Sequence, residues 1–303
     1  MKETFEPCGV LLIDKPAGMT SHDVVGKVRR LYHTRKVGHT GTLDPMATGV
    51  LVILIGRAAK AAEYLSVHNK PYEAVMRLGL TTDTEDTTGQ TLTVSNEIPS
   101  AEQVIEKANT FVGEILQVPP MYSALKVNGQ KLVDLARKGI EVERVARPIT
   151  VFSMACAHLQ SHDYALRVQC SSGTYIRTLC ADIGKALGCG GAMAALRRTE
   201  TGGFTLEECI TPEALETLSE EERLQRLIPT EALFADLPAV NLPAFYEKLC
   251  RSGCEIYQKK INTDHPVGAR VRICNAAGEF FALGEVREFE NGSAIKGIKY
   301  FDV

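Results

Sequence analysis

Long apolar segments are absent from this sequence. The longest purely aliphatic run extends only from Val50 to Ile55, whereas a membrane-spanning helix needs roughly 20 apolar residues. The first residues, Met1 to Pro7, mix acidic side chains with a proline and resemble neither a signal peptide nor an arginine-rich transit peptide. We therefore predict a protein that has no membrane segment and acts in the cytoplasm.

Closely paired cysteines are also absent. The nine cysteines include no CxxC pair, and several stand inside apolar runs, so we predict reduced thiols in the core. The nearest approach to a set of metal ligands consists of Cys250, Cys254, His265 and Cys274. Because a zinc site normally shows tighter pairing, we predict that these residues bind no metal.

Several motifs of common enzymes are missing. The sequence has no GxxxxGK[ST] loop for a nucleoside triphosphate, no GxGxxG that opens a helix, no GxSxG elbow and no HExxH pair. These absences argue against chemistry driven by a bound cofactor.

An excess of positive charge is missing as well, since the formal net charge is −3. This charge argues against a protein that coats nucleic acid indiscriminately. The basic residues are nevertheless clustered, with five of them plus His33 and no acid between Lys27 and Lys36. This first cluster includes Arg29 and Arg30. The other four clusters are Lys126/Lys131/Arg137/Lys138, Arg144/Arg147, Arg197/Arg198 and Lys248/Arg251/Lys259/Lys260. Each alone is typical of a solvated surface, but together they indicate one face that binds a polyanion.

The chain length of 303 residues predicts two domains, because a domain usually has roughly 100–200 residues. Apolar residues make up 45% of the chain, enough for a core that needs neither disulfides nor a metal. Pro229, Pro238 and Pro243 mark a change in composition, and glycine-containing turns follow. We predict a first domain over residues 1–241 and a small β-rich domain over 242–303.

Hydrophobic periodicity, together with the glycines and prolines between the periodic segments, predicts a mixed α+β fold. Residues 32–49 and 81–90 are expected to be loops, and hydroxyl side chains at 20–21, 100 and 172–174 are expected to cap helices. Strands are predicted at 9–14, 50–55, 72–78, 149–157, 164–170, 269–274, 280–286 and 293–298, and helices at about 21–31, 57–65, 102–111, 174–187 and 244–251.

The segment GHTGTLDPMATG, residues 38–49, is the part of the chain richest in candidate chemistry. It places polar side chains between glycines directly before an apolar strand, and loops held by a rigid strand often carry catalytic groups. Asp44 is the candidate within it, although an aspartate before a proline also serves to start a helix.

A catalytic carboxylate that must stay ionised needs a nearby cation. Arg177 is the candidate, in the first turn of the helix predicted from Thr174. It stands off the apolar stripe of that helix, a position that by itself favours a surface arginine.

Four separated motifs resemble those of the bacterial tRNA pseudouridine-55 synthases, the TruB family. They are GVLLIDKPAGMTSHDVV at 9–25, GHTGTLDPMATGVL at 38–51, KPYEAVMRLG at 70–79 and CSSGTYIRTLCADIG at 170–184. The resemblance covers residues 9 to about 205 in order. The tail from residue 245 is similar, more weakly, to the RNA-binding PUA domain that such enzymes carry.

The resemblance implies an isomerase that converts the T-loop uridine of tRNA to pseudouridine by breaking its C1′–N1 bond and rejoining the sugar at C5. The implied fold is a mixed, mainly antiparallel sheet flanked by helices, the pseudouridine synthase fold, with a small PUA-like domain. The implied partner is the T-arm of tRNA, whose uridine must be flipped out of its stack. No cofactor, metal, guide RNA or membrane is implied, and we expect a monomer.

The resemblance also implies roles for individual residues. Asp44 is the catalytic aspartate, Arg177 pairs with it, and Tyr72 packs on the target base and shields or deprotonates C5. The implied neighbours are Lys15 and Pro16 supporting the loop, His39 filling the gap left by the flipped base, Thr42 in the motif and Leu196 in an apolar wall. Phosphate contacts are expected from the basic helix, with Arg29, Arg30 and Lys36, and from the segment that begins at Lys126.

Alternatives remain open at this point. Asp44 could attack C1′ or C6, or only assist formation of a glycal. The chain could instead be an RNA-binding protein that mainly opens and refolds the T-loop, an activity that can coexist with catalysis. It could also be a guide-dependent relative that works inside a ribonucleoprotein.

Overall fold

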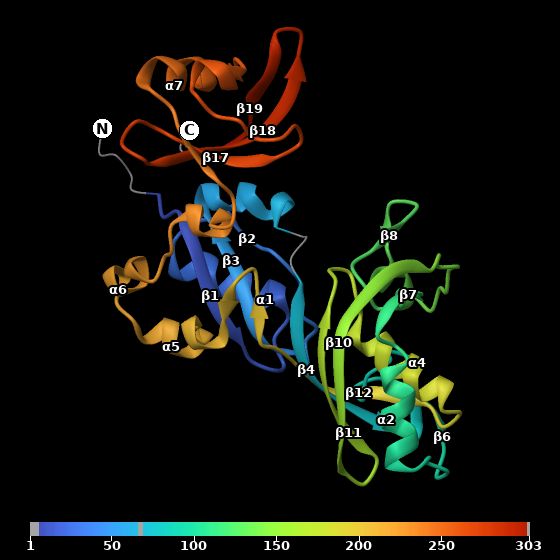
Figure 1. The fold of residues 1–303 in the computed structure, drawn as a ribbon. Coiled ribbons are helices and arrows are strands. Elements are labelled where there is room, and N and C mark those ends of the chain that lie inside the picture. Colours follow the sequence, from blue (N-terminus) through green and yellow to red (C-terminus); the bar gives the residue numbers. More distant parts are fainter. Residues whose placement is uncertain (1–5, 66–68, 302–303) are drawn as a thin grey trace.

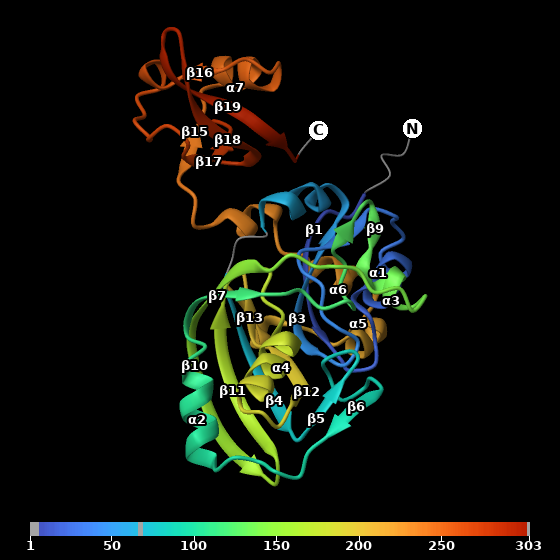
Figure 2. The ribbon, with the colours of Figure 1, turned by 90° about the vertical axis from the view of Figure 1, so that its right-hand side faces the viewer.

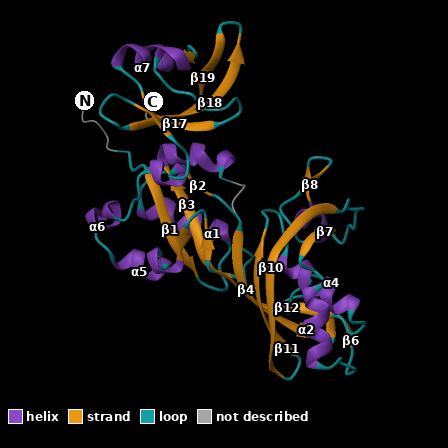
Figure 3. Ribbon diagram, in the orientation of Figure 1, coloured by secondary structure: helices purple, strands orange, loops and turns teal. Residues whose placement is uncertain are grey.

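A long mixed sheet forms the centre of the molecule (Figures 1 and 3). The computed structural model describes residues 6–65 and 69–301. The strands lie in the order β1-β3-β12-β4-β11-β10-β7, with β2 added beside β3. The bounds are Gly9–Lys15 (β1), Val37–His39 (β2), Thr48–Ile55 (β3), Lys70–Leu78 (β4), Gly113–Gln117 (β7), Arg147–Gln160 (β10), Asp163–Cys170 (β11) and Gly191–Arg198 (β12). Apart from β3 and β12, which run parallel, neighbouring strands are antiparallel. The predicted mixed, mainly antiparallel sheet is confirmed.

Helices α2 (Ala101–Asn109) and α4 (Ile176–Ala186) cover one face of this sheet (Figure 2). Together with α1 (Ser21–Leu31), they contribute to a continuous apolar core. Thr20 caps α1 and Ser100 caps α2, each in a reciprocal capping box. Both predicted caps are therefore confirmed.

Smaller elements connect these parts. They are η1 (Gly56–Tyr64), β5 (Leu80–Thr82), β6 (Thr91–Val94), β8 (Lys126–Val127), β9 (Gln130–Lys131), α3 (Leu132–Ala136), β13 (Glu200–Thr201), β14 (Phe204–Thr205), η2 (Leu206–Glu208), α5 (Pro212–Thr217), α6 (Glu220–Gln225) and η3 (Thr230–Phe234).

A second, five-stranded sheet follows in the order β15-β17-β18-β19-β16. Its elements are β15 (Ala239–Asn241), α7 (Ala244–Arg251), β16 (Ile256–Tyr257), η4 (Gln258–Lys260), β17 (Arg270–Cys274), β18 (Phe280–Phe289) and β19 (Gly292–Tyr300). The three strands and the helix predicted here are confirmed. One apolar cluster contains Val10 and Leu54 of the first sheet with Leu283 and Phe301 of the last segment. The division into domains at residue 242 stays a prediction.

Some sequence-based expectations were wrong. Residues 37–39 form a short strand inside the first predicted loop, and the strand 80–82 extends over the first two residues of the second. The helix expected at 57–65 is a 3-10 helix. The strand β12 was not predicted, because its sequence GAMAALRR has little of the β-branched and aromatic character typical of strands. Its one glycine, Gly191, instead allows close contact with α4, since a Cβ there would lie 2.7 Å from the Cys180 carbonyl oxygen.

The cysteine prediction is confirmed only in part. All nine thiols are free, and five of them are buried, but Cys8 and Cys254 are exposed rather than in the core.

In the described parts of the chain, no helix is long and apolar enough to cross a membrane. Over the same residues, no three side chains of the metal-ligating types cluster in a way that could hold an ion.

Candidate active site

The loop between β2 and β3 is anchored to the fold on both sides of Asp44. Ser21, the first residue of α1, donates its hydroxyl to the Leu43 carbonyl and accepts from the Leu43 N–H. Leu43 and Ala47 are buried in the core. Asp44 does not start a helix, because its carbonyl accepts from the Ala47 N–H and closes a turn. The aspartate thus projects from a short, firmly held turn.

Arg177 donates two hydrogen bonds to this aspartate. Its Nε donates to Asp44 Oδ2 at 2.8 Å and its Nη2 donates to Asp44 Oδ1 at 3.1 Å. The Arg177 side chain is 4% exposed, whereas Asp44 keeps 32% of its side-chain surface. A two-point arginine–carboxylate pair fixes both position and charge. The expectation from helix periodicity alone, a surface arginine, was wrong, whereas the pairing implied by the family motif is what the structure contains.

Two further N–H groups of Arg177 also donate hydrogen bonds. Its Nη1 donates to the Thr84 carbonyl at 2.9 Å and its Nη2 to the Tyr122 carbonyl at 2.8 Å. Because these acceptors come from loops far apart in the sequence, the guanidinium holds three segments of the chain together. Its orientation toward Asp44 is therefore determined by the fold.

Asp86 is a second carboxylate beside Arg177 that the sequence analysis did not single out. Its Oδ2 lies 3.9 Å from Arg177 Nη1, and its side chain is almost completely buried. Its Oδ1 accepts from the Thr84 hydroxyl and the Thr88 N–H, both at 2.9 Å. The only signal in the sequence was the run of acids from Asp83 to Asp86, which is more often a solvated loop.

The start of α4 differs from the predicted hydroxyl cap. Tyr175 is the N-cap residue and makes no side-chain capping bond. The buried amide of Gln117 takes over this task, since Tyr175 N–H donates to Gln117 Oε1 at 2.8 Å and Gln117 Nε2 donates to the Tyr175 carbonyl at 3.1 Å. Strand β7 thereby fixes the first turn of the helix that carries Arg177.

Lys15 lies beneath the loop, completely buried. Its Nζ donates to the carbonyls of Pro16, Met19 and Pro45 at 2.8, 2.7 and 3.3 Å. Burial lowers the pKa of Lys15 to about 8, and the nearby Asp44 charge opposes this decrease. The ammonium joins the segment at 16–19 to the residue after Asp44, which is the supporting position expected for Lys15 and Pro16.

The end of the motif is in close contact with β12. Gly49 has φ +105°, and a Cβ there would lie 2.1 Å from the Arg198 carbonyl oxygen. Only glycine tolerates both this backbone conformation and such close approach. The glycine that follows Ala47-Thr48 thus permits the parallel pairing of β3 with β12.

Tyr72 and Leu196 are buried on neighbouring strands, β4 and β12. Burial raises the pKa of Tyr72, while a hydrogen bond with Arg198 and the charge of that guanidinium oppose the increase. The two roles that the resemblance implies for Tyr72, shielding C5 and deprotonating it, stay predictions.

His39 and Thr42 lie in the same loop. His39 is partly buried, its Nδ1 has no hydrogen-bond partner, and burial lowers its pKa. Thr42 is exposed. Neither side chain contacts the Asp44–Arg177 pair through a hydrogen bond, so their implied roles stay predictions.

The residues predicted to contact phosphates are exposed, but two of them also interact with other residues of the protein. Arg29, Arg30, Lys36 and Lys126 are exposed, while Lys36 pairs with Glu6 at 2.8 Å and Arg29 donates to the Val37 carbonyl. Arg198 differs from a solvated cluster residue, because it is 1% exposed. That the basic clusters form one face stays a prediction.

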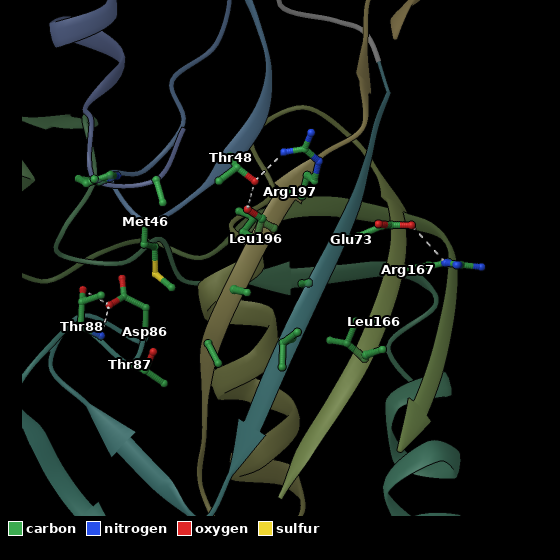
Figure 4. A pocket seen from close by; sticks show the side chains of 18 residues that line it. Met46, Thr48, Glu73, Asp86, Thr87, Thr88, Leu166, Arg167, Leu196 and Arg197 are labelled. Atoms are coloured by element: carbon green, nitrogen blue, oxygen red, sulfur yellow. Dashed lines mark hydrogen bonds and ion pairs between the residues drawn. The ribbon is translucent and has the colours of Figure 1, made fainter. Parts of the chain in front are cut away.

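A cavity of about 950 Å³ opens beside the loop that carries Asp44 (Figure 4). Its walls include Pro45 and Met46, which follow Asp44, together with Asp86 and Leu196. The strands β4, β11 and β12 form its floor, and Glu73 of β4 pairs with Arg167 of the neighbouring β11. Asp44, Arg177 and Tyr72 do not line it, so the cavity adjoins the ion pair rather than containing it. Its volume is in the range of cavities that hold small organic ligands.

The arrangement suits chemistry in which one carboxylate is held in a fixed orientation beside the substrate. Arg177 is buried and uses four donors, whereas the partly exposed Asp44 accepts from it and still reaches solvent. Such a carboxylate can act as a nucleophile or as a base toward a bound substrate.

Comparison with known proteins agrees with this geometry. Residues 29–176 match the model of the TruB family pseudouridylate synthase N-terminal domain, and residues 177–235 match the tRNA pseudouridylate synthase B C-terminal domain. The tRNA pseudouridine synthase B of Dechloromonas aromatica is 52% identical over 234 residues, which are 77% of this chain and 78% of that protein. The enzyme of the same name from Clostridium kluyveri is 44% identical over 282 residues, or 93% of this chain and 96% of that protein.

Solved structures show the same fold. A Cbf5-Nop10-Gar1 complex matches with a TM-score of 0.74 and 28% identity, over 97% of this chain and 84% of that chain. An H/ACA ribonucleoprotein bound to a substrate RNA matches with a TM-score of 0.73 and 26% identity, over 97% and 85% of the two chains. The predicted pseudouridine synthase fold is confirmed. The chain therefore belongs to the TruB family of pseudouridylate synthases and is a tRNA pseudouridine synthase, an isomerase.

Proposed function

We propose that this enzyme isomerises one uridine in the T-loop of tRNA and that Asp44 is the carboxylate that acts on it. The observation that supports this role is the two-point pair of Asp44 with the buried Arg177 on the family's GTLDPMATG segment. In the reaction the C1′–N1 bond breaks, a C1′–C5 bond forms, C5 releases a proton and N1 gains one. Atoms and electrons balance without an oxidant or reductant.

Arg177 supports this role by holding the Asp44 carboxylate in one orientation with two hydrogen bonds. A carboxylate that is already in place needs no reorientation at the moment of reaction. Attack on C1′, attack on C6 and assistance to a glycal all require this ionised carboxylate at the same place. The proposal therefore holds for each of the three routes.

The T-loop uridine must leave its stack to reach Asp44, at a cost of a few kcal/mol. Stacking on an aromatic side chain offsets about 1–3 kcal/mol of this cost. We assign the stacking to Tyr72, and we assign the adjoining cavity to the nucleotides next to the target. Phosphates of the T-arm would be held by the exposed Arg29, Arg30, Lys36 and Lys126. The C-terminal segment, whose 3-10 helix η4 carries the exposed Lys259 and Lys260, would extend this contact as a PUA-like domain.

The Tyr72 assignment predicts unequal effects of two substitutions. Tyr72→Phe keeps the ring and is expected to lower the single-turnover rate less than about tenfold, whereas Tyr72→Leu is expected to lower it by about 10²-fold because stacking is lost too. The measurement is pseudouridine formation with enzyme in excess over tRNA. Equal rates for the three proteins would show that Tyr72 does not hold the base.

The proposed substrate is tested by mapping the product. Purified protein is incubated with an unmodified tRNA transcript, without any other RNA, and pseudouridine is located by carbodiimide adducts that stop primer extension. We expect one modified uridine, in the T-loop, formed by a monomeric enzyme. Modification at several unrelated uridines, or a requirement for an added guide RNA, would contradict the proposal.

A further inference from the structure

Two cationic nitrogens converge on the backbone of the catalytic loop at Gly41. Lys70 begins β4 and Arg198 ends β12, and these strands pair so that Arg198 lies opposite Tyr72. A Cβ atom built on Gly41 would lie 3.3 Å from Lys70 Nζ and 3.4 Å from Arg198 Nη1. Both charges therefore meet beside one glycine, three residues before Asp44.

Neither cation is neutralised by a carboxylate within residues 6–65 and 69–301. Arg198 donates Nε to the Val50 carbonyl at 2.8 Å and Nη2 to the Gly41 carbonyl at 3.1 Å. Lys70 Nζ makes no hydrogen bond or ion pair with these described residues, and burial together with the Arg198 charge lowers the pKa of Lys70. Arg198 is buried and Lys70 is partly buried. Charges that are removed from water are normally paired, so two like charges side by side without a counterion indicate a place for an anion.

The position of the pair indicates which anion. Lys70 and Tyr72 are alternate residues of β4, so their side chains share one face of the strand. Tyr72 is the proposed stacking partner of the target base, and Gly41 belongs to the loop that carries Asp44. An anion between Lys70 and Gly41 is therefore close to both groups assigned to the target nucleotide.

We propose that Lys70 and Arg198 bind the phosphate of a phosphodiester that directly flanks the target uridine, with Lys70 contacting a non-bridging oxygen and Arg198 holding the Gly41 loop in place to receive it. This inference rests on the proposed function, since it names a substrate group at the same site. An ammonium bond to a phosphate oxygen is charge-assisted and about twice as strong as a neutral hydrogen bond. The contact would fix the nucleotide while its base is out of the stack.

The test couples a change in the protein with a change in the RNA. Two T-arm RNAs carry a neutral methylphosphonate, one on the 5′ side of the target uridine and one on its 3′ side. We expect one of the two to bind the wild-type protein about tenfold more weakly than unmodified RNA. We expect Lys70→Met to bind unmodified RNA about tenfold more weakly and to show no further loss with that methylphosphonate.

Lys70→Met is also expected to reduce the slope of log Kd against log salt by about 0.7–0.9, the value of one phosphate contact. Lys70→Arg should restore part of the affinity. Lys107→Met on α2, a partly buried lysine away from the loop, serves as the matched control and should bind like wild type.

Additive losses from Lys70→Met and from each methylphosphonate, or wild-type affinity and salt slope in Lys70→Met, would overturn the phosphate site. Pseudouridine formation by the wild-type protein is measured with the same unmodified RNA. If that reaction occurs without the coupling, only the phosphate site fails, whereas absence of the reaction would contradict the proposed function itself.

Discussion

Replacing Asp44 by Asn is expected to lower pseudouridine formation by at least about 10³-fold while tRNA affinity stays within about fivefold. The amide is nearly isosteric, so the turn held by Ser21 and Ala47 keeps its shape. It lacks the charge that a nucleophile or base needs, and one of its two positions facing Arg177 becomes an N–H₂ donor. The measurements are the single-turnover rate and the affinity for tRNA, determined from the tRNA that the protein retains on a nitrocellulose filter.

The chain offers a matched control for this substitution. Arg77 and Asp163 form a second two-point pair, with bonds of 2.7 and 2.8 Å, between β4 and β11. Asp163→Asn removes a carboxylate from the same kind of pair outside the loop and should leave the rate within about twofold. Turnover by Asp44→Asn within tenfold of wild type would show that Asp44 takes no direct part in the reaction.

Replacing Arg177 by Ala is expected to cost about 10²–10³-fold in rate with a change in tRNA affinity of less than about tenfold. The substitution leaves Asp44, the Thr84 carbonyl and the Tyr122 carbonyl without their shared donor, so the carboxylate is free to reorient. Arg177→Lys restores one charge but not the planar set of donors. We therefore expect a rate for Arg177→Lys between those of wild type and Arg177→Ala.

Asp86→Asn leaves the two hydrogen bonds between Arg177 and Asp44 intact, so we expect it to lower the rate less than Arg177→Ala does. Unchanged turnover in Arg177→Ala would show that the ion pair has no part in catalysis.

The strands and helices with regular apolar periodicity could be predicted from sequence, and so could the hydroxyl caps at Thr20 and Ser100. The strand β12 could not, because its alanines have low strand propensity and its one glycine, Gly191, serves close contact with α4. The start of α4 could not either, since its cap is the Gln117 amide, which is 58 residues away in the sequence.

The candidate site could likewise be predicted from the sequence only in part. Asp44 stood out locally, between glycines and before a strand, whereas the burial of Arg177 depends on acceptors at Thr84 and Tyr122 that only the tertiary fold brings near. The family motif supplied this pairing where helix periodicity favoured the surface. Asp86 and Lys70 were missed because a buried acid in an acidic loop and a lysine at the start of a strand look like ordinary surface residues in a sequence.

The central claim, that Asp44 drives isomerisation of the T-loop uridine, is tested most directly by release of tritium from a tRNA transcript labelled at C5 of its uridines. Wild-type protein, Asp44→Asn and Asp163→Asn are compared on this transcript and on one with cytidine in place of the T-loop uridine. We predict release of one tritium per tRNA by wild type and Asp163→Asn, and none by Asp44→Asn or from the cytidine transcript. Release by Asp44→Asn at the wild-type rate, or release that does not need the T-loop uridine, would contradict the claim.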